Sequence, residues 1–293
     1  MKRNFYLIFI LVAGLCGAAL RCTCLLYGYE AETGLPKEGY LPAMLLVALT
    51  AIVVIVAAVL SRTWFQPCAE KSFEQLFGGM PWSGILCLLC GIGMAVFSVQ
   101  GILWLPDQLA EQYLFEGNEI IMPSPLITGA TALVWVLSFA AGMCVIVLSV
   151  WQRGKKPAGK RTGLLTTIPM FWCCLDLIMV YHQNSGNPVL SDYSYTLLLI
   201  IAVMTAFYSM GGFLYAAKRP AARFFASAGV AVYLALMQMG GMAVWSMLET
   251  SGMGILQLLG TGTALRMDIY LMTGIYLLLQ LGHAINRSRI EAQ

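Results

Sequence analysis

Two ionisable residues lie where this chain is otherwise apolar, and they are the clearest candidates for chemistry. Asp176 falls near or just beyond the middle of the apolar segment 164–182, and Arg21 falls in the last quarter of segment 5–27. A charge at such a depth in a bilayer costs about 3 kcal/mol on insertion scales, so it must pair, face water or serve a function. We expect Arg21 and Asp176 to lie at similar depth and to pair. A structural salt bridge between two helices is the favoured interpretation, and a proton or solute site is the alternative.

Arg266 and Asp268 are two further charged candidates at the start of the last apolar segment, 264–286. Residues two apart on a helix point to different sides, so these two are not expected to pair with each other. Either side chain can instead extend along its helix and place its charge at the outer membrane interface.

Two glutamines and a glycine pair are the other notable positions inside apolar segments. Gln100 and Gln238 can hydrogen-bond to neighbouring helices, a contribution of about 1 kcal/mol each. Gly240 and Gly241, beside Gln238, allow either a close approach of two helices or a break in one helix. Close packing is the favoured interpretation.

The histidines and cysteines lack the spacing of a metal site. Neither His182 nor His283 belongs to a motif such as His-Glu-x-x-His, and Cys87-x-x-Cys90 has no second CxxC with which to bind zinc. Cysteine in lipid behaves as a small apolar side chain. A disulfide between the first and fifth apolar segments is the open alternative. Its candidates are Cys22, Cys24, Cys173 and Cys174.

Motifs for nucleotide binding and for hydrolysis are missing from the sequence. It contains no Walker loop, no GxGxxG before a helix, no GxSxG elbow and no cluster of carboxylates on a loop. The sequence therefore predicts neither a metal site nor a cofactor, and it disfavours an enzyme.

The elements that must position these residues are eight apolar segments, each near the roughly 20 residues that cross a bilayer as a helix. Of the 293 residues, 59% are hydrophobic and 11% are charged, against about 25% charged in a soluble domain. The segments are 5–27, 40–61, 83–105, 124–151, 164–182, 194–217, 223–248 and 264–286. They predict an all-α polytopic bundle of about eight spanning helices, and residues 1–293 then form one integral membrane domain.

The links between the segments alternate between basic and acidic. Of the 17 lysines and arginines, only Arg21, Lys37 and Arg266 fall on the side that the others avoid. The positive-inside rule then places both termini in the cytoplasm. The predicted location is the cytoplasmic membrane, with the lipid bilayer as the principal partner. The net charge of +3 forms no concentrated basic face and argues against a nucleic-acid partner.

Two features of the segments and links have alternatives. The first segment follows Lys2 and Arg3 as a signal peptide would, but its apolar run reaches Tyr27, which favours an uncleaved helix. In the link 67–78, four apolar residues share one face, which predicts an amphipathic helix lying on the membrane and ending at Gly78. A weaker helical pattern covers 106–115.

Two outer loops share a pattern. Residues 29–36 and 181–188 both read Tyr, four residues ending in Thr or Ser, Gly, one residue, Pro. Because four crossings separate the loops, they predict a tandem four-helix repeat with possible halves 1–152 and 153–293. The alternative is that Gly and Pro recur in any tight turn.

The same loops carry a resemblance. The Tyr-x-x-x-Thr-Gly loop that begins at Tyr29 and the stretch Asn-Pro-Val-Leu-Ser-Asp-Tyr at 187–193 are similar to those of a group of uncharacterised multi-pass membrane proteins of anaerobic Gram-positive bacteria. The resemblance covers two short loops and the overall hydropathy. It implies a similar architecture and no particular activity, and it transfers no functional residue.

These observations rank the possible functions. A transporter or permease-like protein for a small anionic or zwitterionic solute comes first, because duplicated halves with an outer cavity near Arg21 and Asp176 would suit it. A non-catalytic scaffold or accessory subunit of a larger complex comes second, and a homo-oligomer is compatible with either. An intramembrane enzyme comes last, because no catalytic constellation is present.

Overall fold

The structure is a computed structural model. It describes residues 2–30, 35–80, 82–110, 114–116, 119–121, 125–154, 160–185, 193–216, 220–249 and 262–290. Eight helices in these ranges are long and apolar enough to cross a bilayer. They are α1 (Lys2–Tyr27), α2 (Leu41–Trp64), α4 (Ser83–Leu103), α6 (Pro125–Arg153), α7 (Lys160–Asn184), α8 (Tyr193–Tyr215), α9 (Ala221–Glu249) and α11 (Gly262–Ile290). All eight predicted segments are confirmed to within a few residues, and the chain is an all-α, multi-pass membrane protein.

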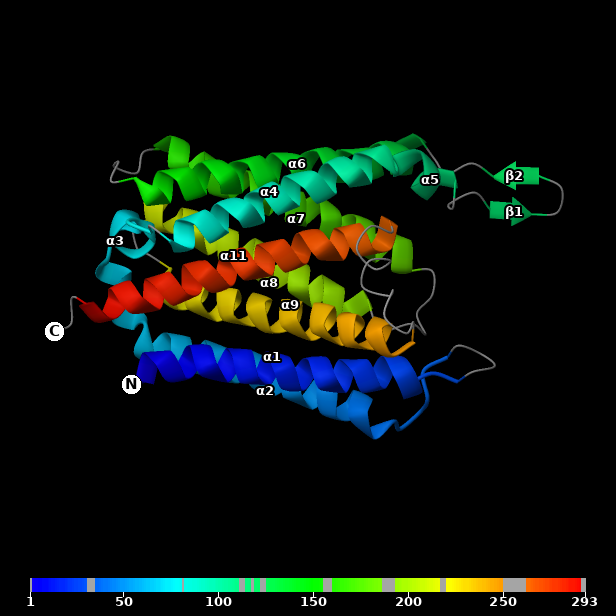
Figure 1. The fold of residues 1–293 in the computed structure, drawn as a ribbon, viewed down its shortest axis with the longest axis horizontal. Coiled ribbons are helices and arrows are strands. Elements are labelled where there is room, and N and C mark those ends of the chain that lie inside the picture. Colours follow the sequence, from blue (N-terminus) through cyan, green and yellow to red (C-terminus); the bar gives the residue numbers. More distant parts are fainter. Residues whose placement is uncertain are drawn as a thin grey trace.

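Six of these helices form a closed ring. In order, α4, α6, α7, α8, α9 and α11 each pack against the next, and α11 returns to α4. The remaining two, α1 and α2, pack against α9 on one side of the bundle (Figure 1). Both termini lie at the same end (Figure 1), as an even number of crossings requires. We call this end the basic end, because Arg62, Arg153, Arg223 and Arg287 lie in its helix termini.

The exterior of the bundle is apolar because lipid, rather than water, surrounds it. Leu41, Met44, Val47 and Ile55 of α2 are all more than half exposed, as are many large hydrophobic residues on the other helices. In water such a surface would drive aggregation. In a bilayer it has no such cost, and cohesion comes instead from close packing and buried polar contacts.

Glycines allow α1 to lie close against α9. A Cβ on Gly241 would lie 2.6 Å from Arg21 Cγ, and a Cβ on Gly240 would lie 2.9 Å from the Cβ of Ala18. Helix α9 continues without a break through both glycines. The packing interpretation of this pair is therefore the one that the structure supports.

The link between α2 and α4 differs from the prediction. A 3₁₀ helix, η1 (Gln66–Glu70), is followed by a short helix, α3 (Phe73–Phe77), which Ser72 caps with Gln75 in a capping box. The helix ends at Gly78 as predicted, but its apolar face turns into the protein rather than onto the membrane. Phe77 packs edge-on against Phe213 of α8 and Phe224 of α9, so α3 covers the basic end of the ring.

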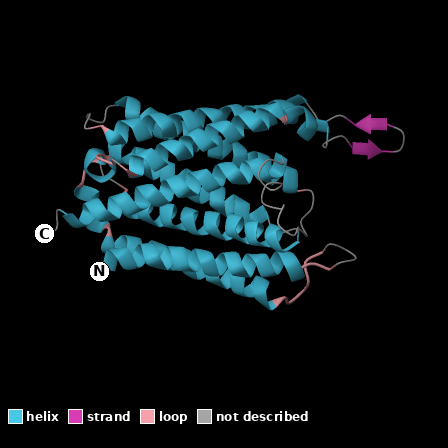
Figure 2. Cartoon of the chain, viewed as in Figure 1, coloured by secondary structure: helices cyan, strands magenta, loops and turns pink. Residues whose placement is uncertain are grey.

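On the opposite end, a short helix, α5 (Leu105–Ala110), precedes an antiparallel hairpin of β1 (Leu114–Glu116) and β2 (Glu119–Ile121). Figure 2 shows this hairpin beyond an otherwise helical molecule. The predicted helical pattern over 106–115 is confirmed up to Ala110 and is wrong at Leu114 and Phe115, whereas residues 111–113 lie outside the described part of the chain.

The two loops of the proposed repeat begin differently. Tyr29 follows α1 and forms a β-bridge with Pro36, whereas Tyr181 and His182 still belong to the last turns of α7. His182 was expected in a loop, and that expectation was wrong. Residues 186–192 lie outside the described part of the chain. The division into halves stays a prediction, although packing does not follow it, since α1 and α2 contact α9 of the second half.

Candidate functional site

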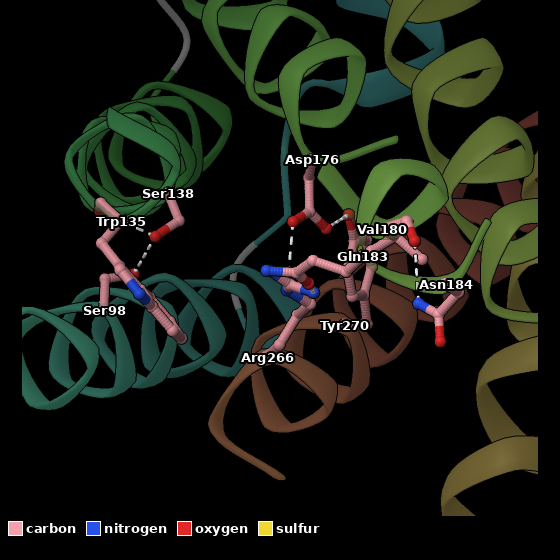
Figure 3. A network of polar contacts seen from close by, with 9 residues as sticks. All are labelled: Ser98, Trp135, Ser138, Asp176, Val180, Gln183, Asn184, Arg266 and Tyr270. Atoms are coloured by element: carbon pink, nitrogen blue, oxygen red, sulfur yellow. Dashed lines mark hydrogen bonds and ion pairs between the residues drawn. The ribbon is translucent and has the colours of Figure 1, made fainter. Parts of the chain in front are cut away.

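Asp176 is the centre of a buried polar cluster inside the six-helix ring. Its Oδ2 accepts a 2.7 Å hydrogen bond from the Tyr270 hydroxyl, and its Oδ1 lies 3.1 Å from Arg266 Nε. Figure 3 shows the carboxylate of α7 between these two side chains of α11. The side chain of Asp176 is 0% exposed, so the positive charge of Arg266 is needed to offset the cost of burying the carboxylate.

One member of the ion pair is partly exposed. The Arg266 side chain is 18% exposed, and its Nη1 donates a 3.2 Å hydrogen bond to Gln183 Oε1 near the end of α7. The close Nε–Oδ1 approach is an ion pair without the alignment of a hydrogen bond. Of the five N–H donors of a guanidinium, Nε of Arg266 is buried and has no hydrogen-bond acceptor among the described residues.

An aromatic pair forms the inner wall of the cluster. The rings of Trp172 and Tyr270 stack with centroids 4.9 Å apart, and both residues are buried. Cys173 is buried next to Tyr270 and Asp176. Since Trp172 and Asp176 are four apart on α7, one face of this helix supplies both the wall and the acid.

Arg21 is not the partner of Asp176, which corrects the pairing expected from the sequence. In the described part of the chain, the hydrogen bond and the ion pair of the Asp176 carboxylate both go to α11. Arg21 is buried against Gly241 of α9, with its guanidinium carbon 5.7 Å from the centre of the Tyr195 ring. The sequence predicted a similar depth in the bilayer for both residues, but not which helices are neighbours. Helix α1 packs on α9 and α2, whereas α7 packs on α6 and α8, so the two residues do not meet.

The other sequence candidates divide between the interior and the surface. Asp268 is 1% exposed and does not extend to the surface, contrary to the expectation. Arg266 is 18% exposed, with its Nε beside Asp176 and its Nη1 bonded to the exposed Gln183. Among the described residues, neither oxygen of Asp268 has a hydrogen-bond partner. Gln238 is buried, and its Nε2 donates a 3.3 Å hydrogen bond to the Thr196 hydroxyl of α8. This is the interhelical bond that was expected. Gln100 instead faces outward.

Arg266 and Tyr270 begin a line of polar side chains that follows α11 through the ring, which we call the α11 polar stripe. Each member contacts another element of the bundle or lies in its interior. The members are Arg266, Tyr270, Thr273, Tyr276, Gln280, His283 and Arg287. Their spacing of three or four residues keeps them on one face, and the α11 span is the least apolar of the eight that the structure describes.

Halfway along, the stripe meets α4 and α8. The Thr273 hydroxyl lies 3.6 Å from the Met94 sulfur, and the ring of Tyr276 stacks on Phe207 with centroids 6.0 Å apart. The Tyr276 hydroxyl is buried and has no hydrogen-bond partner among the described residues. In this part of the stripe, the polar side chains therefore contact mainly apolar neighbours.

Near the basic end, two glutamines form a reciprocal amide pair. Gln152 Nε2 donates to Gln280 Oε1 at 3.1 Å, and Gln280 Nε2 donates to Gln152 Oε1 at 2.7 Å. Both are buried, and Gln280 also lies 3.7 Å from the Cys87 sulfur. The pair joins α6 to α11 across the ring, and neither glutamine was a candidate from the sequence.

Replacing Gln280 alone should show how much the amide pair contributes to the stability of the bundle. In Gln280→Leu the Gln152 amide stays buried without its partner, which should cost about 2 kcal/mol. The double change Gln152→Leu with Gln280→Leu removes both amides and should return the stability to within about 1 kcal/mol of the original. The measurement is the thermal unfolding midpoint in detergent. A double variant as unstable as the single one would contradict the pairing.

At the basic end, the stripe holds the link after α3. His283 Nε2 lies 3.1 Å from the carbonyl oxygen of Gly78, and Arg287 Nη2 lies 3.4 Å from that of Gly79. Gly79 has a φ of +71°, a conformation that favours glycine, and a Cβ there would collide with the Arg287 guanidinium. Lys71 in turn donates to the Arg287 carbonyl oxygen at 3.1 Å.

Seven of the nine cysteines are buried, whereas Cys16 is exposed and Cys174 is partly buried. None of the nine, all of which lie in the described part of the chain, forms a disulfide. The described residues contain no group of three or more His, Cys, Asp or Glu side chains placed to hold a metal ion. Beside the Asp176 cluster, Ser138 of α6 donates to Ser98 of α4 at 2.8 Å (Figure 3), another polar bond between neighbouring helices.

The comparisons with known proteins add no relative to this description: no protein-family model, no curated protein and no solved structure matches the chain. The resemblance of its loops to a group of bacterial membrane proteins therefore stays a prediction.

Proposed function

We propose that this membrane protein is a transporter for a small polar solute, with the Asp176 cluster as its recognition site. The observation that carries the proposal is the α11 polar stripe, which places polar groups along the interior of a six-helix ring from one end to the other. Burying so many polar side chains is costly where apolar packing would suffice. A solute path through the ring accounts for them.

The chemistry of the cluster favours a zwitterion as the solute. Asp176 and Arg266 offer one negative and one positive group at a separation of 3.1 Å. A carboxylate of the solute can replace Asp176 on the guanidinium, while an ammonium group of the solute takes the place of Arg266 on Asp176. The net charge inside the bundle then stays constant as the solute binds, which avoids an isolated charge in low dielectric.

Access to the site supports binding from the end opposite the basic end. Arg266 is partly exposed and its partner Gln183 is exposed, whereas Trp172 and Tyr270 close the cluster on the inner side. At the basic end, α3 covers the ring with Phe77 packed against α8 and α9. The arrangement corresponds to a carrier closed at one end, and transport would require the contacts around α3 to open.

The test uses the purified protein with a panel of the twenty standard L-amino acids and small carboxylates. We expect at least one zwitterion to raise the thermal unfolding midpoint and to enter proteoliposomes as a radiolabelled solute. The double variant Asp176→Asn with Arg266→Gln keeps a neutral hydrogen-bonding pair. It should fold but lose at least about tenfold in uptake, the equivalent of one charge-assisted hydrogen bond.

Gln100→Ala is the matched control, because Gln100 is an exposed amide outside the ring. Its uptake should equal that of the unaltered protein. A panel without any stabilising or transported zwitterion would contradict the proposed solute class. Unchanged uptake in the folded double variant would show that the Asp176 cluster is not part of the transport path.

A scaffold or accessory subunit is the second candidate, and a specific observation favours it. The polar groups of the ring partner one another, as in the Gln152–Gln280 pair and the Asp176 cluster, which a purely structural role also requires. Helix α2 is the least buried of the eight spans, so its outer face is free to contact another membrane protein. This function would be favoured if the unaltered protein carried no solute flux and the double variant still assembled normally into a larger complex.

A further inference from the structure

Outside the ring, a groove runs between α2, α8 and α9 from the basic end toward the middle of the bundle. At the basic end it is a pocket of about 900 Å³ that includes Arg62 and Arg223. Further along it becomes an apolar slot of about 280 Å³. The two parts share Ala58, Arg223 and Ala226, so they form one continuous hollow. We call it the α2–α9 groove.

The mouth of the groove is positively charged. Arg62 and Arg223 are exposed, and neither forms an ion pair with a carboxylate among the described residues. The guanidinium carbon of Arg223 lies 5.8 Å from the centre of the Tyr208 ring, a cation–π contact that holds it over α8. Lys218 and Arg219 precede α9 in the sequence and add to the positive charge of this link.

The slot is lined by apolar side chains of three helices. Val54 of α2, Leu198 and Ile201 of α8 and Leu234 of α9 line it. From Arg223 to Leu234, α9 rises about 16 Å at 1.5 Å per residue. This length matches one leaflet, about half of the roughly 30 Å hydrocarbon thickness of a bilayer. The slot therefore reaches from headgroup level to about the bilayer centre.

We infer that the α2–α9 groove is a binding site for an anionic phospholipid, which places its phosphate on Arg62 and Arg223 and one acyl chain in the slot. Two arginines at headgroup level attract an anionic lipid by about 1 kcal/mol each, a gain that a net-neutral lipid lacks. A soluble anion would use the mouth only and leave the apolar slot without an occupant. The site is separate from the Asp176 cluster and does not depend on the proposed transport.

The test is native mass spectrometry of the detergent-solubilised protein with equal amounts of phosphatidylglycerol and phosphatidylcholine. We expect retained lipid to be enriched in phosphatidylglycerol. Each arginine should contribute about fivefold to this preference, so Arg62→Gln with Arg223→Gln should abolish it. Arg153→Gln is the matched control, since Arg153 is also exposed at the basic end but lies outside the groove.

A second variant tests the slot. Ala58 is exposed at the junction of the two parts, so Ala58→Trp should obstruct the acyl chain without disturbing the interior. Retention of phosphatidylglycerol should fall, while the arginines remain. Competition with sn-glycerol 3-phosphate distinguishes the sources of phosphate: the soluble anion should not displace the lipid at equal concentration.

Four outcomes would overturn the inference. Equal retention of the two lipids, or an equal loss of preference in Arg153→Gln, would mean ordinary contact with surrounding lipid only. Displacement by sn-glycerol 3-phosphate at equal concentration would mean a site for a soluble anion. Unchanged retention of phosphatidylglycerol by a folded Ala58→Trp variant would show that the slot does not hold the acyl chain.

Discussion

Removing the Arg266 guanidinium while Asp176 remains should destabilise the bundle by about 3–5 kcal/mol, because it leaves a fully buried carboxylate without its counter-charge. Arg266→Gln is the variant, and the measurement is the unfolding midpoint in detergent. Asp176→Asn should cost less, since Arg266 is partly exposed and can turn toward the aqueous side. Combining the two changes leaves a neutral pair and should recover most of the loss.

Arg21 provides the comparison for this experiment. It is also a buried arginine of the outer half, but it contacts α9 and the ring of Tyr195 rather than Asp176. Arg21→Gln should therefore gain nothing when Asp176→Asn is added. Rescue of the Arg21 variant, and no rescue of the Arg266 variant, would show that Asp176 pairs with α1 after all.

Gly142→Ala should also be strongly destabilising, by about 2 kcal/mol, because α6 crosses α4 with the two backbones in contact. A Cβ on Gly142 would lie 2.8 Å from the backbone nitrogen of Ala95, and a Cβ on Gly91 would lie 2.9 Å from that of Ile146. Backbone atoms cannot turn aside as a side chain does, so the helices must separate. The loss should appear in the thermal midpoint and in the yield of monodisperse protein.

Gly129 is the matched control on the same helix. A Cβ there meets nothing within 4 Å, so Gly129→Ala should be neutral or should stabilise α6 by up to about 1 kcal/mol. If both alanine variants behaved alike, helix propensity rather than the α4–α6 contact would govern the response.

Much of the fold was predictable because it depends on each segment by itself. Whether a stretch such as 41–64 leaves water depends on its own apolar side chains. The direction of threading, for which charges such as Arg62 and Arg153 are the signal, stays a prediction. The position of Asp176 as a buried acid followed from the same local argument. The polar stripe was also present in the spacing of Arg266, Tyr270, Thr273 and Gln280, and a search for polar periodicity in 264–286 would have found it.

What the sequence by itself determined is therefore the number of crossings, their approximate ends and the residues that lie too deep for water. Only the tertiary structure decided that Asp176 meets Arg266 rather than Arg21, that Gln152 meets Gln280, and that α3 turns its apolar face inward. The physical reason is that transfer into lipid is a sum over one helix. Partner choice depends instead on which helices are neighbours in the ring, and small residues such as Gly91 and Gly142 contribute to this through close contacts that no single segment encodes.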